Sequence, residues 1–352
     1  MLLDVISGCL PPSDFPFAEA KCNEALPGSK RVTDSKGQRL LITPEPRKNV
    51  MVESVLALSM LCSWFMPISL APVLSALLLY YAAKLSLVAW TFICLMVALS
   101  FIPPGTEWDA YRQSKMWETW HRYFQVQYIL PELPYLKPDK HYLFAQFPHG
   151  VYPMNAWLAM TFAGRQGSGS SGNLKGAIAS IFFSLPLIKH NYAWVGCLSA
   201  DKQSMLTALK HSSLACLPEG IAGIFEGASP SREAIYLQHR KGFVKVAIEA
   251  GVDIVPIYTL GQSQILTFRG SEKLSRMCRA SIGLWWGWGG LPIPRPHKLI
   301  TLVGAPIPVQ QNDNPKKEEV EALHAKVVKA IADMYAEHRS LLGWEDRPLH
   351  IV

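Results

Sequence analysis

A histidine directly follows an apolar segment in the tetrapeptide Phe147-Pro148-His149-Gly150. The preceding residues 142–146 have the composition of a β-strand, and the active sites of α/β sheets gather where strands end. Proline fixes the direction of the chain at this point, and glycine allows a substrate close to the backbone. An imidazole displayed there can take a proton from a hydroxyl group near neutral pH. The same residues also fit a structural histidine that caps the strand.

A glycine-rich turn at residues 217–225 offers a second chemical site. It reads Leu-Pro-Glu-Gly-Ile-Ala-Gly-Ile-Phe and again follows an apolar run. Backbone N–H groups around Gly220 could hold an oxyanion or a phosphate. Glu219 could orient His149 or a cationic group. An ordinary glycine-rich loop explains the same residues, so the sequence alone leaves both interpretations open.

Basic residues open a helix at residues 240–247, and this helix leads into another apolar run. The N-terminus of such a helix suits an anion, because its free N–H groups and its dipole both favour negative charge. The phosphates of coenzyme A would fit there. The candidate substrate-binding residues of this segment are Arg240, Lys241, Gly242, Phe243 and Lys245. A solvated basic helix face is the alternative.

Tryptophan and glycine alternate in residues 285–295, which read Trp-Trp-Gly-Trp-Gly-Gly-Leu-Pro-Ile-Pro-Arg. These aromatic rings could line an acyl channel or contact lipid, and they could equally serve in packing. The sequence has no G-x-S-x-G elbow, no Walker loop and no HExxH motif, which argues against a serine esterase, an NTPase and a zinc protease. Seven scattered cysteines without a C-x-x-C pair argue against a metal site or a disulfide framework.

Downstream of about residue 140, short apolar runs alternate with segments of helical period. This rhythm predicts an α/β domain with a largely parallel sheet flanked by helices. The expected strands are residues 142–146, 193–197, 214–217, 252–258 and 299–303. The expected helices are residues 154–163, 177–188, 201–211 and 240–250, together with an amphipathic helix that opens at Asn314-Pro315. Residues 164–176 are rich in Gly and Ser and are typical of a flexible loop.

The most apolar part of the chain is residues 54–102, where Lys84 is the only charged residue. A bilayer-spanning helix needs about 20 apolar residues, so this part is long enough for two passes, 54–83 and 85–102. Basic residues flank both ends, which predicts that both ends face the cytosol and that the segment is a membrane hairpin. A buried helical layer of a soluble protein is the alternative.

Composition narrows the choice of partners. The 352 residues are 49% hydrophobic and 17% charged, with a formal net charge of +7. A chain that is both this apolar and this basic is better suited to binding an anionic membrane surface or an anionic substrate than to binding nucleic acid. Residues 107–130 mix Trp and Tyr with charge, and they fit either an interfacial helix or an amphipathic helix packed on the domain. We expect three parts: an irregular cytosolic arm (1–53), a membrane hairpin (54–103) and a catalytic domain (104–352).

Four ordered blocks resemble the type-2 diacylglycerol acyltransferase family, which includes monoacylglycerol acyltransferases and some wax synthases. Residues 147–150 are similar to its His-Pro-His-Gly box, and residues 240–261 to its R-x-G-F-x-[KR]-x-A…G…VP…G signature. The other two similar blocks are the Trp-Gly-Gly-Leu-Pro-Ile-Pro loop at 288–294 and the Val-Gly-Ala-Pro-Ile-Pro-Val run at 303–309, followed by Glu319, Val320 and His324.

The chain departs from the family pattern at Gln125, where the family often has the proline of an upstream Tyr-Phe-Pro, and at two further positions. Phe147 stands where the family box begins with histidine, so the resemblance assigns proton transfer to His149. The acidic residue of the family's P-G-G-x-x-E loop would fall at Gly223, whereas here it stands at Glu219, as in the Pro-Glu-Gly of the wider glycerolipid acyltransferases. Those enzymes pair their histidine with an Asp five residues on, and Met154 occupies that position here.

The resemblance implies an acyl-CoA-dependent O-acyltransferase that esterifies diacylglycerol to triacylglycerol on a glycerolipid-acyltransferase-like α/β fold. It implies catalysis by His149 and Glu219 without a metal. The implied substrate-binding residues are Phe147, Pro148, Gly150 and Gly220 with the basic segment already described. Acyl-CoA would be a co-substrate, so no cofactor is expected.

The expected partners are acyl-CoA, diacylglycerol and membrane lipid, with self-association left open. The expected location is the endoplasmic reticulum membrane with the catalytic domain in the cytosol, or a lipid droplet. Two alternatives stay open: a monoacylglycerol or fatty-alcohol acceptor, and a membrane lipid-binding protein without catalysis.

Overall fold

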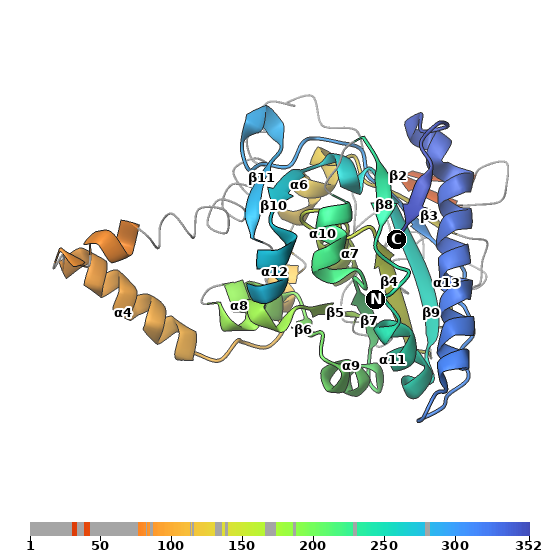
Figure 1. The fold of residues 1–352 in the computed structure, drawn as a ribbon, viewed down its shortest axis with the longest axis horizontal. Helices are drawn as coiled ribbons and strands as arrows, with labels where there is room; N and C mark the ends of the chain where they lie inside the picture. Colours follow the sequence, from red (N-terminus) through yellow and green to blue (C-terminus); the bar gives the residue numbers. More distant parts are fainter. Residues whose placement is uncertain are drawn as a thin grey trace.

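The protein is an α/β structure built on one mixed sheet, with helices on both faces (Figure 1). This confirms the predicted α/β class with a largely parallel sheet flanked by helices. The computed structural model describes residues 30–33, 39–42, 77–81, 83–84, 87–112, 114, 116–130, 136–137, 140–165, 174–185, 188–227, 231–278 and 282–352. Within these residues the sheet has nine strands in the order β1-β2-β3-β12-β9-β4-β7-β5-β6.

Five neighbouring strands form the parallel part of the sheet, in the order β9-β4-β7-β5-β6. They are β9 (Asp253–Leu260), β4 (Tyr142–Phe147), β7 (Ser213–Cys216), β5 (Leu174–Ile178) and β6 (Cys197–Ser199). The antiparallel pairings join β12 to β9, β2 to β3 and β1 to β2, while β3 runs parallel to β12. These outer strands are β12 (Ile300–Val303), β3 (Gln127–Leu130), β2 (Arg39–Ile42) and β1 (Lys30–Thr33).

Helices bury both faces of the sheet. One face packs with α6 (Met116–Tyr123), α7 (Met154–Arg165) and α8 (Ile188–Trp194). The other face packs with α9 (Lys202–Leu209), α11 (Gly242–Ala250) and α13 (Lys317–His338). Strand β4 serves both cores, because alternate side chains of a strand point to opposite faces. All six of its residues are buried and all but Gln146 are apolar, which is typical of a parallel strand that is buried on both sides.

Smaller elements complete the body. The short helices are α5 (Asp109–Arg112), α10 (Gly220–Glu226) and α12 (Glu272–Cys278). Two small sheets pair β8 (Glu233–Ile235) with β13 (Leu349–Ile351), and β10 (Thr267–Gly270) with β11 (Gly283–Trp286). The 3₁₀ turns are η1 (Ser180–Ser184), η2 (Gln262–Gln264), η3 (Trp288–Gly290) and η4 (Arg339–Leu342).

The amphipathic C-terminal helix is confirmed as α13, which begins at Lys317. Val320, Leu323, Val327 and Ile331 recur three or four residues apart and are buried on one face of the helix. This face covers the core that also holds α11, so the spacing of apolar residues correctly predicted which side of the helix is buried.

Two predicted elements around residue 180 are wrong. Residues 177–188, predicted as a helix, contain the end of β5 and the turn η1, and residues 193–197, predicted as a strand, contain the end of α8. Short apolar runs do not distinguish strand from helix by periodicity alone. Here the pairing of β5 with β6 sets the structure, and glycine at 176 favours their close approach, because a Cβ atom there would lie 3.0 Å from Cys197 Sγ.

Parts of the predicted N-terminal arm and membrane hairpin can be compared with the structure. Strands β1 and β2 lie inside the segment expected to be a mostly irregular arm, and they extend the sheet beyond β3. Helix α4 (Leu87–Phe101) is apolar throughout, and its Leu87 and Phe101 side chains are 79% and 81% exposed. Residues 54–76 of the predicted hairpin lie outside the described residues. In the described part of the chain, no helix has the length and hydropathy to cross a membrane.

The aromatic segment 107–130 packs on the domain, so the interfacial interpretation is wrong for its helix α6. Trp117 and Trp120 of this helix are fully buried in the core on one face of the sheet. The indole N–H of Trp117 donates a hydrogen bond to the carbonyl oxygen of Tyr111 at 2.8 Å.

Candidate active site

Three parallel strands bring the candidate site together at one edge of the sheet. His149 follows the end of β4, Glu219 follows the end of β7, and Gln262 follows the end of β9. Because neighbouring parallel strands end at the same edge, residues far apart in the sequence meet there. His149 itself is half-buried, so its ring is neither sealed in the core nor fully exposed.

The imidazole of His149 has a defined orientation. Its Nδ1 lies 2.8 Å from the carbonyl oxygen of Gly150. Because a carbonyl oxygen only accepts hydrogen bonds, Nδ1 carries the proton and Nε2 keeps a free lone pair. Burial lowers the pKa of His149 below its ordinary value, and the bond to Gly150 opposes this only in part. At neutral pH the ring is therefore neutral and able to accept a proton through Nε2.

Glu219 holds the backbone of the histidine loop and does not touch the imidazole. One carboxylate oxygen accepts the main-chain N–H of His149 at 2.5 Å, and the other accepts that of Tyr236 at 2.9 Å. The side chain is fully buried. Burial raises the pKa of Glu219 to about 8, although the two N–H donors and Arg240 oppose the shift. The structure thus makes Glu219 a positioning residue that joins the loops at 149 and 236.

Gly223 accounts for the position of this carboxyl. A Cβ atom on Gly223 would lie 2.5 Å from Glu219 Cβ and 2.9 Å from Glu219 Oε1. A side chain at 223 and the glutamate at 219 would therefore fill overlapping space, one turn apart on the same side of α10. The glycine is required by the close approach of Glu219.

Two further residues that the sequence did not single out fix the same loop. The amide of Gln262 donates to the carbonyl oxygen of Tyr152 at 2.7 Å, and its oxygen accepts the main-chain N–H of Asn155 at 3.2 Å. The amide of Asn155 donates to the carbonyl oxygen of Pro148 at 3.2 Å. Gln262 also excludes a side chain at Gly150, which has φ +63° and would place a Cβ atom 2.9 Å from Gln262 Nε2. The position of Gln262 just after a strand end was the one available signal.

Arg240 is the basic residue that lies near the site. Its guanidinium stands 5.1 Å from the centre of the Tyr236 ring, and Nη2 would lie 3.9 Å from a Cβ atom on Gly220. Its charge acts on the pKa of Glu219. The residue is half-buried, and its buried Nε has no hydrogen-bond partner among the described residues.

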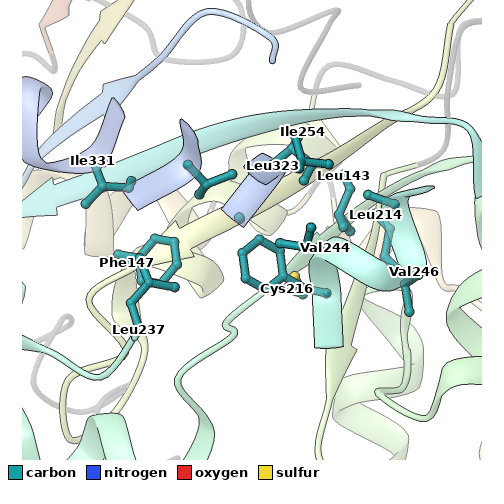
Figure 2. Close-up of a cluster of buried hydrophobic side chains, with 14 of the residues drawn as sticks. Leu143, Phe147, Leu214, Cys216, Leu237, Val244, Val246, Ile254, Leu323 and Ile331 are labelled. Atoms are coloured by element: carbon teal, nitrogen blue, oxygen red, sulfur yellow. The ribbon is translucent and has the colours of Figure 1, made fainter. Parts of the chain in front are cut away.

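Five other predicted binding residues lie at the solvent-exposed surface or in the apolar core. Lys241 pairs with Glu321 at 3.0 Å, and Lys245 lies 4.0 Å from Glu249, with both lysines at the solvent-exposed surface. Phe243 and Phe147 are buried in the apolar core under α11 and α13, where Figure 2 shows the Phe147 ring beside Leu237. Gly242 begins α11 and is exposed.

A second buried carboxyl, Glu233, lies behind this site. Its oxygens accept hydrogen bonds from the hydroxyls of Tyr258 and Ser263, both at 2.7 Å, and Arg347 binds one of them at 3.2 Å. Glu233 begins β8, and Arg347 precedes β13, the strand that pairs with β8. The network therefore locks the C-terminal segment onto the strand that precedes Tyr236. Among the described residues, no group of three or more His, Cys, Asp or Glu side chains could hold a metal ion.

A family model described as diacylglycerol acyltransferase matches residues 77–351. The chain belongs to the diacylglycerol acyltransferase family. This confirms the resemblance drawn from the four sequence blocks. The match contains both core faces, the histidine loop and the Glu233 network.

Several proteins with similar sequences are named as acyltransferases. The chain is 28% identical to 2-acylglycerol O-acyltransferase 3 of Homo sapiens, over 68% of this chain and 75% of that protein. It is 27% identical to diacylglycerol O-acyltransferase 2 of Dictyostelium discoideum, over 65% and 74% of the two chains. It is 26% identical to human acyl-CoA wax alcohol acyltransferase 1, over 59% and 69%. All three names describe acyltransferases, and they differ in the acceptor.

Proposed function

We propose that this protein transfers a fatty acyl group from acyl-CoA to diacylglycerol and so forms triacylglycerol. The observation that carries the proposal is the His149 ring, half-buried at the carboxyl edge of the sheet. Its Nδ1 is held by Gly150, and its Nε2 makes no hydrogen bond to the described residues. Membership of the family supports acyl transfer, and its named relatives support an acylglycerol or alcohol acceptor.

In the proposed reaction, His149 Nε2 takes the hydroxyl proton of diacylglycerol while the hydroxyl oxygen attacks the thioester carbonyl of acyl-CoA. The tetrahedral intermediate carries its negative charge on the former carbonyl oxygen. Its collapse breaks the carbon–sulfur bond, and the thiolate of CoA takes the proton back from the imidazolium. The products are the ester and free CoA, so protons and electrons balance within the two substrates and one imidazole.

The surrounding groups have supporting roles in this proposal. Arg240 is the cation available to a phosphate of CoA or to the oxyanion, since Lys241 and Lys245 are held in ion pairs at the surface. Glu219, Gln262 and Asn155 hold the loop so that the imidazole keeps one orientation. Such fixed geometry contributes much of the acceleration in acyl transfer.

Membrane association is part of the same proposal. The exposed apolar side chains of α4 and the formal charge of +7 support a membrane anchor in residues 54–103 and a body that faces anionic lipid. We place the enzyme at the endoplasmic reticulum membrane or a lipid droplet, with the body in the cytosol. A monoacylglycerol or fatty-alcohol acceptor is the second candidate, because relatives with those names match equally well.

The experiment offers labelled oleoyl-CoA to microsomes that contain the protein, with diacylglycerol, monoacylglycerol or fatty alcohol in parallel. We expect triacylglycerol as the main product and a loss of at least about 100-fold in the His149→Ala variant, because general-base catalysis contributes 10²–10⁴-fold. The matched control is His211→Ala, an exposed histidine before β7 at the opposite edge of the sheet.

The outcomes separate the candidates. Near-normal activity of His149→Ala at equal protein level would refute the catalytic assignment. A product from monoacylglycerol or fatty alcohol alone would replace diacylglycerol as the acceptor. Binding of lipid without any product in the parent protein would support the lipid-binding alternative.

A further inference from the structure

The unit formed by β10, α12 and β11 is unusual among the described residues because it exposes large apolar side chains. Ten such side chains are exposed among the described residues between 104 and 352, and this unit with the turn that follows it contributes six of them. These six residues, which we call the hairpin face, are Leu274, Met277, Ile282, Leu284, Trp288 and Leu291. Contiguous exposed apolar surface on a folded body marks a site of interaction.

The inner side of the same hairpin is anchored beside the catalytic loop. Phe268 of β10 and Trp285 of β11 are directly opposite each other and pack against Ile224 and Val151. Val151 is two residues beyond His149. The hairpin is therefore amphipathic, with an inner side that packs on the active site and an outer side that is open to the surroundings.

Charge indicates which partner the hairpin face meets. Leu284, 77% exposed, lies opposite the exposed Arg269 in the two-stranded sheet, so an apolar side chain and a cation share the outer side. Residues 267–295 contain five basic residues and one acidic residue. Apolar side chains and tryptophan mixed with Arg and Lys are suited to the surface of a bilayer that contains anionic lipid.

The position of the unit agrees with this partner. Figure 1 shows α12 and the β10–β11 hairpin on the side of the body that faces α4, whose Leu87, Val88 and Phe101 are 79%, 80% and 81% exposed. Apolar surface on two separate elements of one side is what a common lipid surface would cover.

From these observations we infer that the hairpin face is a second membrane contact, separate from the N-terminal segment. It rests on an anionic bilayer surface and holds the mouth of the His149 site against the lipid. A membrane-dissolved acylglycerol then reaches the imidazole without crossing water. The inference rests on the proposed function for its purpose, although the contact itself can be measured without activity.

A photo-crosslinking experiment tests the contact directly. The variant Leu284→p-benzoylphenylalanine is irradiated in microsomes that contain radiolabelled phospholipid, and the control variant Lys210→p-benzoylphenylalanine carries the same probe at an exposed position before β7. We expect label on the protein with the probe at 284 and none with the probe at 210. Crosslinks from 284 to a second copy of the chain or to another protein, or no crosslink, would overturn the inference.

Kinetics test the consequence for the substrate. For Met277→Ser/Leu284→Ser we expect KM for dioleoylglycerol in phosphatidylserine-containing vesicles to rise about 10-fold or more, because two side chains no longer enter the apolar layer. With dihexanoylglycerol dispersed in water, kcat/KM should stay within about twofold of the parent. Equal losses with both acceptors would mean that the two residues support the fold and not the membrane contact.

Failure of this inference can be distinguished from failure of the proposed function. If the parent protein makes no triacylglycerol but the probe at 284 still labels lipid, the proposed reaction is wrong and the membrane contact stands. If the parent protein is active and the probe at 284 labels no lipid, the reaction stands and the contact is wrong.

Discussion

Two buried carboxyls, Glu219 and Glu233, show how one chemical group can serve two purposes in neighbouring regions. Both side chains are fully buried, and burial raises the pKa of each. Glu219 is bound by two main-chain N–H groups, from His149 and Tyr236. Glu233 is bound by two hydroxyls and by Arg347.

The difference lies in what each carboxyl joins. The donors of Glu219 belong to two loops at the catalytic edge, so Glu219 fixes backbone positions near His149. The partners of Glu233 are side chains from β9, the turn after it and the C-terminal segment, so Glu233 fixes the packing of β8 and β13. We therefore expect changes at Glu233 to affect mainly stability and changes at Glu219 to affect mainly catalysis.

The largest effect is expected for Arg347→Met, which leaves Glu233 buried without its cation. Removing one partner of a buried ion pair costs about 3–5 kcal/mol in the free energy of unfolding, and the apparent Tm should fall accordingly. The control Lys329→Met removes an exposed pair with Asp333 and should change stability by no more than about 1 kcal/mol. In Arg347→Met/Glu233→Gln no uncompensated charge remains, so much of the stability should return. A double variant no more stable than the single one would contradict the ion-pair account.

Glu219→Gln should lower kcat while the protein remains folded. A carboxamide has one accepting oxygen, so one of the two N–H donors loses its partner at a cost of about 1–3 kcal/mol. If half or more of this appears as a misplaced His149 loop, kcat falls about 2-fold to 160-fold. The dependence of kcat on pH tests the role of Glu219. The apparent pKa that reports His149 should be the same in the variant and the parent, since Glu219 does not contact the imidazole. A shifted apparent pKa would show that Glu219 acts on the ring itself.

Moving the carboxyl by one turn should restore part of this loss. We expect Gly223→Glu alone to be inactive or poorly folded, because its Cβ would lie 2.5 Å from Glu219 Cβ. In the double variant Glu219→Gly/Gly223→Glu, the glutamate at 223 no longer overlaps a side chain at 219. Its carboxyl group begins beside the space that the Glu219 side chain occupied. The double variant should therefore exceed Glu219→Gly in kcat by about 3-fold to 10-fold, or about 1 kcal/mol. Activity equal to that of Glu219→Gly would show that the carboxyl must come from position 219.

A further effect concerns pH. The pKa of Glu219 is about 8 in the folded protein and 4.5 ordinarily, so between these values the folded state binds more protons than the unfolded state. Stability must then fall as pH rises from about 5 to 8, by at most about 1.4 kcal/mol per pH unit for this one group. Thermal unfolding of the parent and of Glu219→Gln over this range measures the difference, and parallel curves would show that Glu219 does not titrate there.

The sequence by itself determined the largely apolar strands β4, β7, β9 and β12, the amphipathic helix α13, and the position of His149 after β4. Each of these follows from a local pattern, since the spacing of apolar residues selects a strand or a helix whatever the rest of the chain does. The four sequence blocks also identified the family.

Only the tertiary structure decided how the site is assembled. Glu219 reaches the main chain of His149 across 70 residues of sequence, and Gln262 reaches the same loop across 113 residues. The order of the strands in the sheet creates these contacts, and no local pattern encodes that order. The same holds for the basic segment. From the sequence, Arg240, Lys241 and Lys245 were all equally good candidates for binding an anion. Packing of α11 against α13 placed Lys241 beside Glu321 and left Arg240 next to the loop of Gly220.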